Sequence, residues 1–320
     1  MFNDLREFIS KCEEIGEYQL IEGADTEREI GALSLLISEK PNSPLLLFDK
    51  IKGHQPGYRV VSNVFTTPRR TALGMGLPMD LKGIDLVKAF RGRMKAGIPL
   101  IPPVEVDSGP ALENIQTGDD VDLLKFPSPQ WNELDGGPYI GTGQMTVFRD
   151  PDDDWINVGV YRVQVHDKKT CTIHTVESHH LDIIQKRYWN KGKSVPVVVT
   201  CGQDPISWLG ANWSAPWGTC EYDIAGGWRG SPIEVIKGKL TGLPFPATSE
   251  IVLEGELVPP AVETRLEGPF GEWPGYFATG KVARPAFRVK AVMHRNDPII
   301  QGAPPSRLPA VWSLGRHIQR

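Results

Sequence analysis

The chain has 320 residues, of which 40% are hydrophobic and 23% charged, so it is long enough for two domains of ordinary globular composition. Its formal net charge is −4 and no segment carries a block of Lys or Arg, which argues against a nucleic-acid partner. No apolar run approaches the roughly 18 residues of a membrane span, and residues 1–7 carry acids where a signal peptide is basic and then apolar. The four cysteines are widely spaced and form no CxxC pair, so we expect a cytoplasmic protein with free thiols.

Helices and strands alternate in the first hundred residues. Apolar residues at helical spacing over 4–15 predict a first helix, and the capping-box pattern from Thr26 to Glu29 predicts a second. Thr67 followed by Pro68 predicts the N-cap and first residue of a third. Short strands are expected at 18–21, 45–48 and 59–65. This alternation is typical of an α/β domain.

The chain changes character after this first part. Residues 98–138 are punctuated by prolines and predict an extended connection over the surface. β-rich runs dominate afterwards, at 143–148, 155–165, 171–176, 195–200, 233–240, 250–258 and 287–295. Helices are expected over 178–189, after Asp204-Pro205 and from Glu221. The strand count fits an antiparallel barrel with inserted helices, so the predicted fold class is α+β.

Two carboxylates, Glu267 and Glu272, flank a spacer at 268–271 that contains Gly, Pro and Gly. Such a spacer breaks a helix and bends a strand, so we expect a tight turn with both acids able to face one cavity. Taken alone, the pattern also fits a surface turn with two solvated glutamates. The stretch 157–162 favours the first interpretation, because it offers an amide, a glycine and an arginine that could bridge two carboxylates.

Several long segments in a fixed order resemble one protein family. They are residues 4–8 (DLREF), 157–162 (NVGVYR), 246–255 (PATSEIVLEG) and 266–272 (LEGPFGE). Together they are similar to the UbiD-type decarboxylases, which use prenylated FMN. The resemblance extends over the whole chain and therefore implies a fold and a chemistry for both parts of it.

The resemblance implies three segments. Residues 1–125 correspond to an N-terminal α/β domain, and residues 126–302 correspond to a split β-barrel that holds the flavin. Residues 303–320 are Pro-rich at their start and correspond to a linker toward a C-terminal oligomerisation domain that is absent from the printed sequence. A homo-oligomer is expected where that domain is present.

Three residues of the two motifs acquire catalytic roles from the resemblance. Glu272 matches the family's proton donor, and Arg162 and Glu267 match the ion network around it. An arginine shared by two carboxylates can keep one ionised while the other exchanges its proton. Without the resemblance, a structural salt bridge would be the simpler interpretation.

A metal site follows from the same resemblance. Asn157, His180 and Glu221 match the family's ligands for a divalent ion, Mn²⁺ or Mg²⁺, beside the flavin phosphate, with a K⁺ nearby. An amide oxygen, an imidazole and a carboxylate suit such an ion. Their spacing alone is no metal motif, and Asn157 could equally be a turn-forming amide and Glu221 a charge at a helix N-terminus. His179 is expected beside the cofactor rather than on the metal.

The remaining cofactor contacts are expected from the strand before Arg162. The backbone of Val160 and Tyr161 would contact the flavin, and Gly159 would allow its close approach. Aromatic residues in 211–217 could line a pocket for a flat substrate or simply pack in the core. Cys220 is interpreted as a buried thiol. No role is assigned to His166, His174, His294 and His317.

The leading functional hypothesis is reversible decarboxylation, or carboxylation, of an aromatic or α,β-unsaturated acid, with a flavin prenyltransferase as supplier of the cofactor. Loss of carbon dioxide leaves electrons on carbon, and no side chain is a good sink for them. The alternative is a catalytically silent, cofactor-binding subunit of a larger carboxylase assembly. A flavin oxidoreductase is a third class, but the sequence offers no nicotinamide site.

Overall fold

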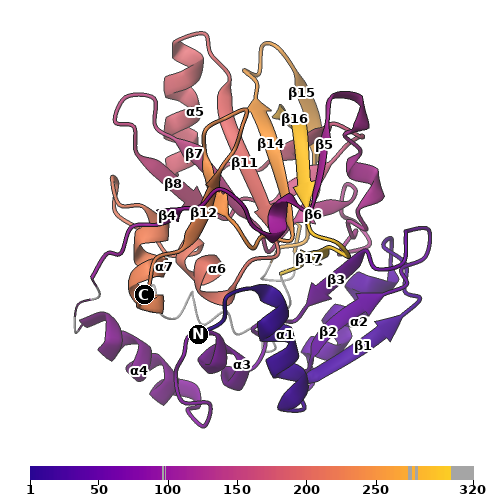
Figure 1. Ribbon diagram of the computed structural model, residues 1–320. Helices are drawn as coiled ribbons and strands as arrows, with labels where there is room; N and C mark the ends of the chain where they lie inside the picture. Colours follow the sequence, from indigo (N-terminus) through magenta and orange to yellow (C-terminus); the bar gives the residue numbers. More distant parts are fainter. Residues whose placement is uncertain (96, 98, 273–275, 278–279, 304–320) are drawn as a thin grey trace.

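The computed structural model describes residues 1–303 except 96, 98, 273–275 and 278–279. A four-stranded sheet with the N-terminal helices forms one end of the molecule, and a ten-stranded sheet forms the other (Figure 1). The mixed α+β fold class predicted from the sequence is confirmed. No helix in the part of the chain that the structure describes combines the length and the apolar character that crossing a membrane requires.

The N-terminal sheet has the strand order β1-β2-β3-β17, so its last strand comes from the end of the described chain. β1 and β2 are parallel, β2 and β3 antiparallel, and β3 and β17 parallel. The strands are β1 (Tyr18–Glu22), β2 (Leu45–Asp49), β3 (Arg59–Ser62) and β17 (Ile299–Gln301). The helices of this part are α1 (Leu5–Glu14), α2 (Glu29–Ser38), α3 (Pro68–Gly74) and α4 (Gly83–Lys95).

The helix caps follow the local sequence, with one difference. The Thr67 side chain accepts a hydrogen bond from the Arg70 N–H and caps α3, as predicted. α2 begins at Glu29, and its N-cap residue, Arg28, makes no side-chain capping hydrogen bond, so the predicted cap at Thr26 is wrong. The turn before the helix is held instead by Asp25. Its carboxylate accepts hydrogen bonds from three successive backbone N–H groups, and Glu29 Oε2 accepts the Asp25 N–H at 2.9 Å.

The ten-stranded sheet is antiparallel throughout, with the order β6-β9-β10-β16-β14-β11-β7-β8 and with β5 and β15 paired to β16. Its strands are β5 (Asn114–Thr117), β6 (Tyr139–Gly141), β7 (Met145–Arg149), β8 (Ile156–Gly159), β9 (Val163–Val165), β10 (Thr170–Ile173), β11 (Val195–Cys201), β14 (Ile251–Leu257), β15 (Thr264–Glu267) and β16 (Val282–His294). The path runs from β6 to β8 without joining them, so no closed barrel forms among the described residues.

Three helices and a small sheet accompany this large sheet (Figure 1). The helices are α5 (His180–Asn190), α6 (Pro205–Ala211) and α7 (Glu221–Arg229), and the three-stranded sheet has the order β13 (Pro244–Pro246), β12 (Glu234–Lys237) and β4 (Val104–Glu105). Short 3₁₀ turns lie at Pro110–Leu112, Gly118–Asp120 and Leu123–Lys125. Asp204 caps α6 by accepting two backbone N–H groups at 3.1 Å, and α7 begins at Glu221, both as predicted.

The segment 98–138 is more than a surface connection. Within it, β4 joins the small sheet and β5 joins the large one. It also packs against the N-terminal part: a Cβ at Gly31 in α2 would lie 2.1 Å from the Trp131 carbonyl oxygen, so only glycine fits there. Beyond Ala303, the predicted linker to residue 320 lies outside the described residues.

Candidate active site

Arg162 lies in the connection between β8 and β9 and joins the two carboxylates of the Gly-Pro-Gly turn. Its Nε and Nη2 donate to Glu267 Oε1 and Oε2 at 2.7 and 3.1 Å, and its Nη1 donates to Glu272 Oε1 at 2.6 Å. Glu267 is the last residue of β15 and its side chain is 1% exposed, whereas that of Glu272 is 29% exposed. The expected convergence of both acids on one arginine is therefore present, with one acid buried and the other partly exposed.

Glu267 has two further partners. The Tyr139 hydroxyl donates to Oε1 at 2.9 Å, and His174 Nδ1 lies 3.4 Å from Oε2. Burial alone would raise the pKa of Glu267, but the hydrogen bonds and charges of His174 and Arg162 outweigh it and lower that pKa to about 2. Glu267 is thus fixed as an anion near neutral pH. Burial alone would lower the pKa of the Arg162 guanidinium, but its hydrogen bonds to the Glu267 carboxylate and the charge of that carboxylate raise it.

The turn that carries Glu272 is tied to a loop just before β6. Asp135 Oδ1 accepts the Gly271 N–H at 2.8 Å, and the Gly136 N–H donates to the Pro269 carbonyl at 2.7 Å. Gly268 adopts φ +84°, a left-handed conformation that favours glycine. The Phe270 ring lies under the guanidinium of Arg162, with its centroid 4.8 Å away. These contacts fix the turn against the arginine.

A second cluster joins β8, α5 and α7. Asn157 Nδ2 donates to Glu221 Oε1 at 2.8 Å and lies 3.1 Å from His180 Nδ1, while the Val158 N–H donates to Glu221 Oε2 at 2.7 Å. All three side chains predicted as metal ligands therefore meet. His180 is the first residue of α5, while His179 is its exposed N-cap and does not join the cluster.

The cluster has features that suit a cation. Asn157 is 1% exposed, and its Oδ1 is buried without a hydrogen-bond partner among the described residues. Burial raises the pKa of Glu221 to about 8 and lowers that of His180, so burial disfavours the charged form of both side chains. A bound cation would stabilise the ionised Glu221 carboxylate and the neutral His180 imidazole. No group of three His, Cys, Asp or Glu side chains in the described part could hold a metal, so the donor set depends on the amide of Asn157.

Two tryptophans flank His180. The rings of Trp155 and Trp217 contact its imidazole edge to face, with centroids 5.1 and 5.4 Å away, and pack on each other at 4.7 Å. The guanidinium of Arg187 lies over the Trp217 ring, with its central carbon 4.9 Å from the ring centroid. Of the expected aromatic wall at 211–217, Trp217 thus lies beside the candidate ligand, while Trp213 packs against Phe90 and Trp228.

Residues 159–161 connect the two clusters. A Cβ at Gly159 would lie 2.6 Å from the Tyr161 ring, so a larger residue here would displace that ring. The Tyr161 hydroxyl accepts the Leu181 N–H at 3.4 Å, and Val160 is half-buried. Cys220, interpreted from the sequence as a buried thiol, is half-buried, and desolvation raises its pKa to about 12.

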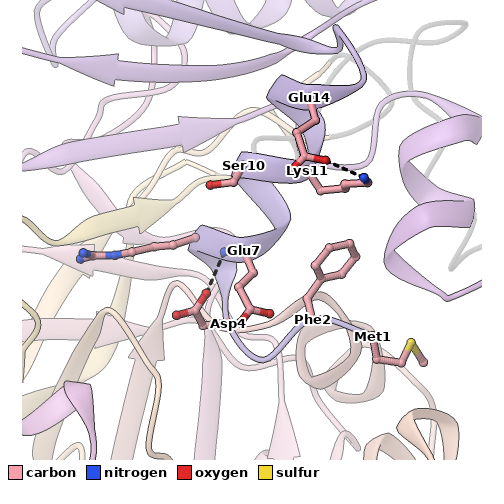
Figure 2. Close-up of a pocket in the computed structure, with 8 residues that line it drawn as sticks. Met1, Phe2, Asp4, Glu7, Ser10, Lys11 and Glu14 are labelled. Carbon is pink, nitrogen blue, oxygen red and sulfur yellow. Dashed lines mark hydrogen bonds and ion pairs between the residues drawn. The ribbon is translucent and has the colours of Figure 1, made fainter.

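A hollow of about 520 Å³ lies on the surface around α1 (Figure 2). Its side chains are tied to one another, with the Glu7 N–H donating to Asp4 at 2.8 Å and Lys11 paired with Glu14 at 2.6 Å. It is lined by Met1, Phe2, Asp4, Arg6, Glu7, Ser10, Lys11 and Glu14, none of which belongs to either cluster. The candidate chemistry therefore lies elsewhere.

Residues 103–308 match the family model of the UbiD 3-octaprenyl-4-hydroxybenzoate carboxy-lyase Rift-related domain, which spans well over half of the chain. The chain belongs to the UbiD family. Residues 9–90 also match the N-terminal domain of the same carboxy-lyase. The two matches confirm the resemblance noted in the sequence, and they include both clusters described above.

Curated UbiD relatives are similar over nearly the whole chain. The pyrrole-2-carboxylic acid decarboxylase of Pseudomonas aeruginosa is 34% identical over 97% of this chain and 64% of its own. The phenolic acid decarboxylase of Bacillus subtilis is 32% identical over 94% of this chain and 63% of its own. The chain thus spans less than two thirds of the length of the relatives it matches.

Solved structures of UbiD proteins have the same fold. The closed form of the vanillic acid decarboxylase ShVdcCD of Sedimentibacter hydroxybenzoicus gives a TM-score of 0.89 at 29% identity, over 97% of this chain and 65% of that one. An evolved dimeric form of the UbiD-class enzyme HmfF of Pelotomaculum thermopropionicum, in complex with prFMN, gives 0.85 at 28% identity, over 96% and 68%.

Proposed function

We propose that this chain catalyses the reversible, non-oxidative decarboxylation, or carboxylation, of an aromatic or α,β-unsaturated acid with prenylated FMN. The observation that carries the proposal is Arg162 bonded to both Glu267 and Glu272, one acid buried and the other half-open. The named relatives support it, since they are decarboxylases of pyrrole-2-carboxylic and phenolic acids, and a UbiD-class neighbour is in complex with prFMN.

The two carboxylates are suited to different tasks. Glu267, with its pKa lowered to about 2, remains an anion and holds Arg162 by two hydrogen bonds. Glu272 receives one hydrogen bond from Arg162 and has solvent access, so it can exchange a proton. We assign to Glu272 the delivery of a proton to the carbon from which carbon dioxide has left, and its removal in the reverse direction.

Bound prenylated FMN would supply the electron sink that no side chain provides. Asn157, His180 and Glu221 would hold Mn²⁺ or Mg²⁺ against its phosphate, with K⁺ nearby. The orphaned Asn157 Oδ1 and the buried Glu221 carboxylate support this assignment. The remaining contacts to the cofactor are assigned to Gly159, Val160, Tyr161, Arg162 and His179.

We also propose that the ten-stranded antiparallel sheet is the split β-barrel of the flavin-binding domain, 126–302, following an α/β domain, 1–125. The two family matches are separated by residues 91–102, and β5 at 114–117 already pairs with β16 of the large sheet, so both observations favour a division somewhat before residue 125. One strand crosses either division, since β17 pairs with β3. We assign the protein to a homo-oligomer in the cytoplasm, where its four thiols stay reduced.

Co-expression with a flavin prenyltransferase tests the proposal. The ultraviolet–visible spectrum and mass of the bound cofactor should report prenylated FMN, and headspace carbon dioxide should appear with a pyrrole carboxylic acid, a phenolic acid or a cinnamic-type acid. A chain that binds the cofactor but releases no carbon dioxide from this panel would instead be a silent subunit of a larger assembly. A chain that binds no flavin would contradict both interpretations.

A further inference from the structure

His174 lies against the Arg162–Glu267 pair but has no role in the mechanism described above. It directly follows β10, and its backbone N–H donates to the Arg162 carbonyl at 3.0 Å. Its side chain is 18% exposed, and Nδ1 lies 3.4 Å from Glu267 Oε2. The same residue is therefore tied to the main chain of the arginine and directed at the carboxylate that holds the arginine's side chain.

His174 Nδ1 lies near a positively charged side chain as well as near the Glu267 carboxylate. Arg284 of β16 brings Nη2 to 3.3 Å from His174 Nδ1. A neutral imidazole with its lone pair on Nδ1 accepts from Arg284, whereas an imidazole with a proton on Nδ1 donates to Glu267. One nitrogen cannot do both at once, so the position of a single proton selects the partner.

The charged groups around the ring connect this selection to the candidate site. They are Glu267 from β15, Arg284 from β16 and Arg162, which shares Glu267 with the imidazole. When His174 donates to Oε2, Glu267 is held from both sides, by Arg162 and by the imidazole. When His174 accepts from Arg284, Glu267 keeps its hydrogen bonds from Arg162 and Tyr139, and less of the Arg162 charge remains for Glu272.

We propose that His174 is a positioning residue that sets, through the proton on Nδ1, how Arg162 is shared between Glu267 and Glu272. The inference rests on the proposed function for its catalytic consequence, but the selection between Glu267 and Arg284 is a property of the folded chain. The hydrogen bond from His174 also contributes to the low pKa of Glu267, which agrees with this arrangement.

The catalytic consequence is tested with His174→Leu and His174→Asn in the cofactor-loaded chain, assayed for kcat and KM over a range of pH. Leu removes the contact, and Asn retains an N–H near the Nδ1 position but cannot titrate. We expect His174→Leu to lower kcat roughly tenfold with KM unchanged, the scale seen when an orienting partner is lost. His174→Asn should recover most of kcat but lose part of the pH dependence.

His54→Asn is the control, because the His54 ring contacts the Lys125 carbonyl at 3.3 Å, in the N-terminal part of the chain. It should leave kcat and the pH profile as in the parent. A His174→Leu chain with parental kcat and pH profile would overturn the proposal. If that variant does not fold, the pH profile of His174→Asn decides: a profile identical to the parent's would equally overturn it.

Nuclear magnetic resonance of chains labelled with [¹⁵N]histidine tests the partner selection without any turnover. Near neutral pH, Glu267→Gln should shift the His174 ring signals toward the form with a free lone pair on Nδ1, and Arg284→Met should shift them toward Nδ1–H. Unchanged His174 signals in both variants would refute the selection. A parent without decarboxylase activity would refute the proposed function alone, because these spectra would still report on His174.

Discussion

Arg162 and Glu267 are joined by two side-by-side hydrogen bonds, from Nε to Oε1 at 2.7 Å and from Nη2 to Oε2 at 3.1 Å. This fork geometry fixes the plane of the guanidinium, which leaves Nη1 directed at Glu272. The ion pair is nearly inaccessible on the Glu267 side, so its strength is little screened by salt.

The first prediction concerns stability and pH. The pKa of Glu267 is lowered from 4.5 to about 2, so the unfolded chain binds more protons than the folded one between these values. The stabilisation, roughly 3 kcal/mol, is fully present above about pH 4.5 and is lost as the pH falls through about 2. Denaturant unfolding at several pH values should show a smaller loss of stability below pH 4.5 for Glu267→Gln than for the parent.

Glu263→Gln is the control for that experiment. Glu263 pairs with two arginines, Arg265 and Arg288, at 2.6 and 2.7 Å, but its side chain is more exposed than that of Glu267. Its replacement should leave the pH dependence of the unfolding free energy close to that of the parent. Equal pH dependence in the Glu267→Gln variant and the parent would contradict the lowered pKa.

The second prediction concerns Glu272. Glu272→Gln keeps the shape and hydrogen bonding of the side chain but cannot deliver a proton, so turnover should fall by at least about 10²-fold while cofactor binding persists. Solvent-deuterium exchange at the substrate α-carbon should disappear in the same variant. Glu256→Gln is the control, because Glu256 is also 29% exposed and paired, with Lys290 at 2.9 Å. Turnover of Glu272→Gln within a few-fold of the parent would remove Glu272 from the mechanism.

The third prediction concerns Glu221. Because it bonds Asn157 and the Val158 N–H and lies in the candidate cation site, Glu221→Ala should reduce divalent metal and flavin content together. Metal analysis and flavin absorbance of the purified chain measure both. Asp223→Ala, in the same first turn of α7, is the control and should retain both. Full occupancy in the Glu221 variant would show that the ligand assignment is wrong.

The fourth prediction concerns Trp217, which packs on His180 while 38% exposed. Trp217→Ala should leave the fold intact but free the imidazole to rotate, which weakens Mn²⁺ binding roughly tenfold, as when other partners that orient a ligand are removed. Titration with Mn²⁺ followed by electron paramagnetic resonance gives the affinity. Trp217→Phe keeps an aromatic ring there and should recover most of the affinity, and equal affinities in all three chains would exclude an orienting role.

The sequence allowed prediction of those features that depend on residues close together in the chain. The caps at Thr67 and Asp204 and the start of α7 are local, because a cap joins residues only two or three positions apart. The cap of α2 was placed on Thr26, but the helix begins at Glu29 without a side-chain cap, and the Asp25 carboxylate holds the preceding turn through three N–H groups. Local rules thus predicted the helix but not how its N-terminus is held.

Contacts across strands were beyond such rules. Tyr139 and His174 reach Glu267 only because β15, β10 and β6 belong to one sheet, and nothing in their local sequence signals the carboxylate. Barrel closure was equally inaccessible, because it depends on strand tilt and stagger rather than on strand number. His180 was favoured over His179 by resemblance, and in the structure His180 is the one that reaches Asn157, a contact that no local pattern signals.

Because β17 pairs with β3, the N-terminal sheet acquires its last strand only late in synthesis. The N-terminal sheet leaves the ribosome early, but the partner of Arg59 to Val61 is Ile299 to Gln301, near the end of the described chain. Until that segment emerges, β3 presents an unpaired edge to other nascent chains. We therefore expect chaperone dependence during translation, and a chain cut between its two family matches to aggregate through this edge.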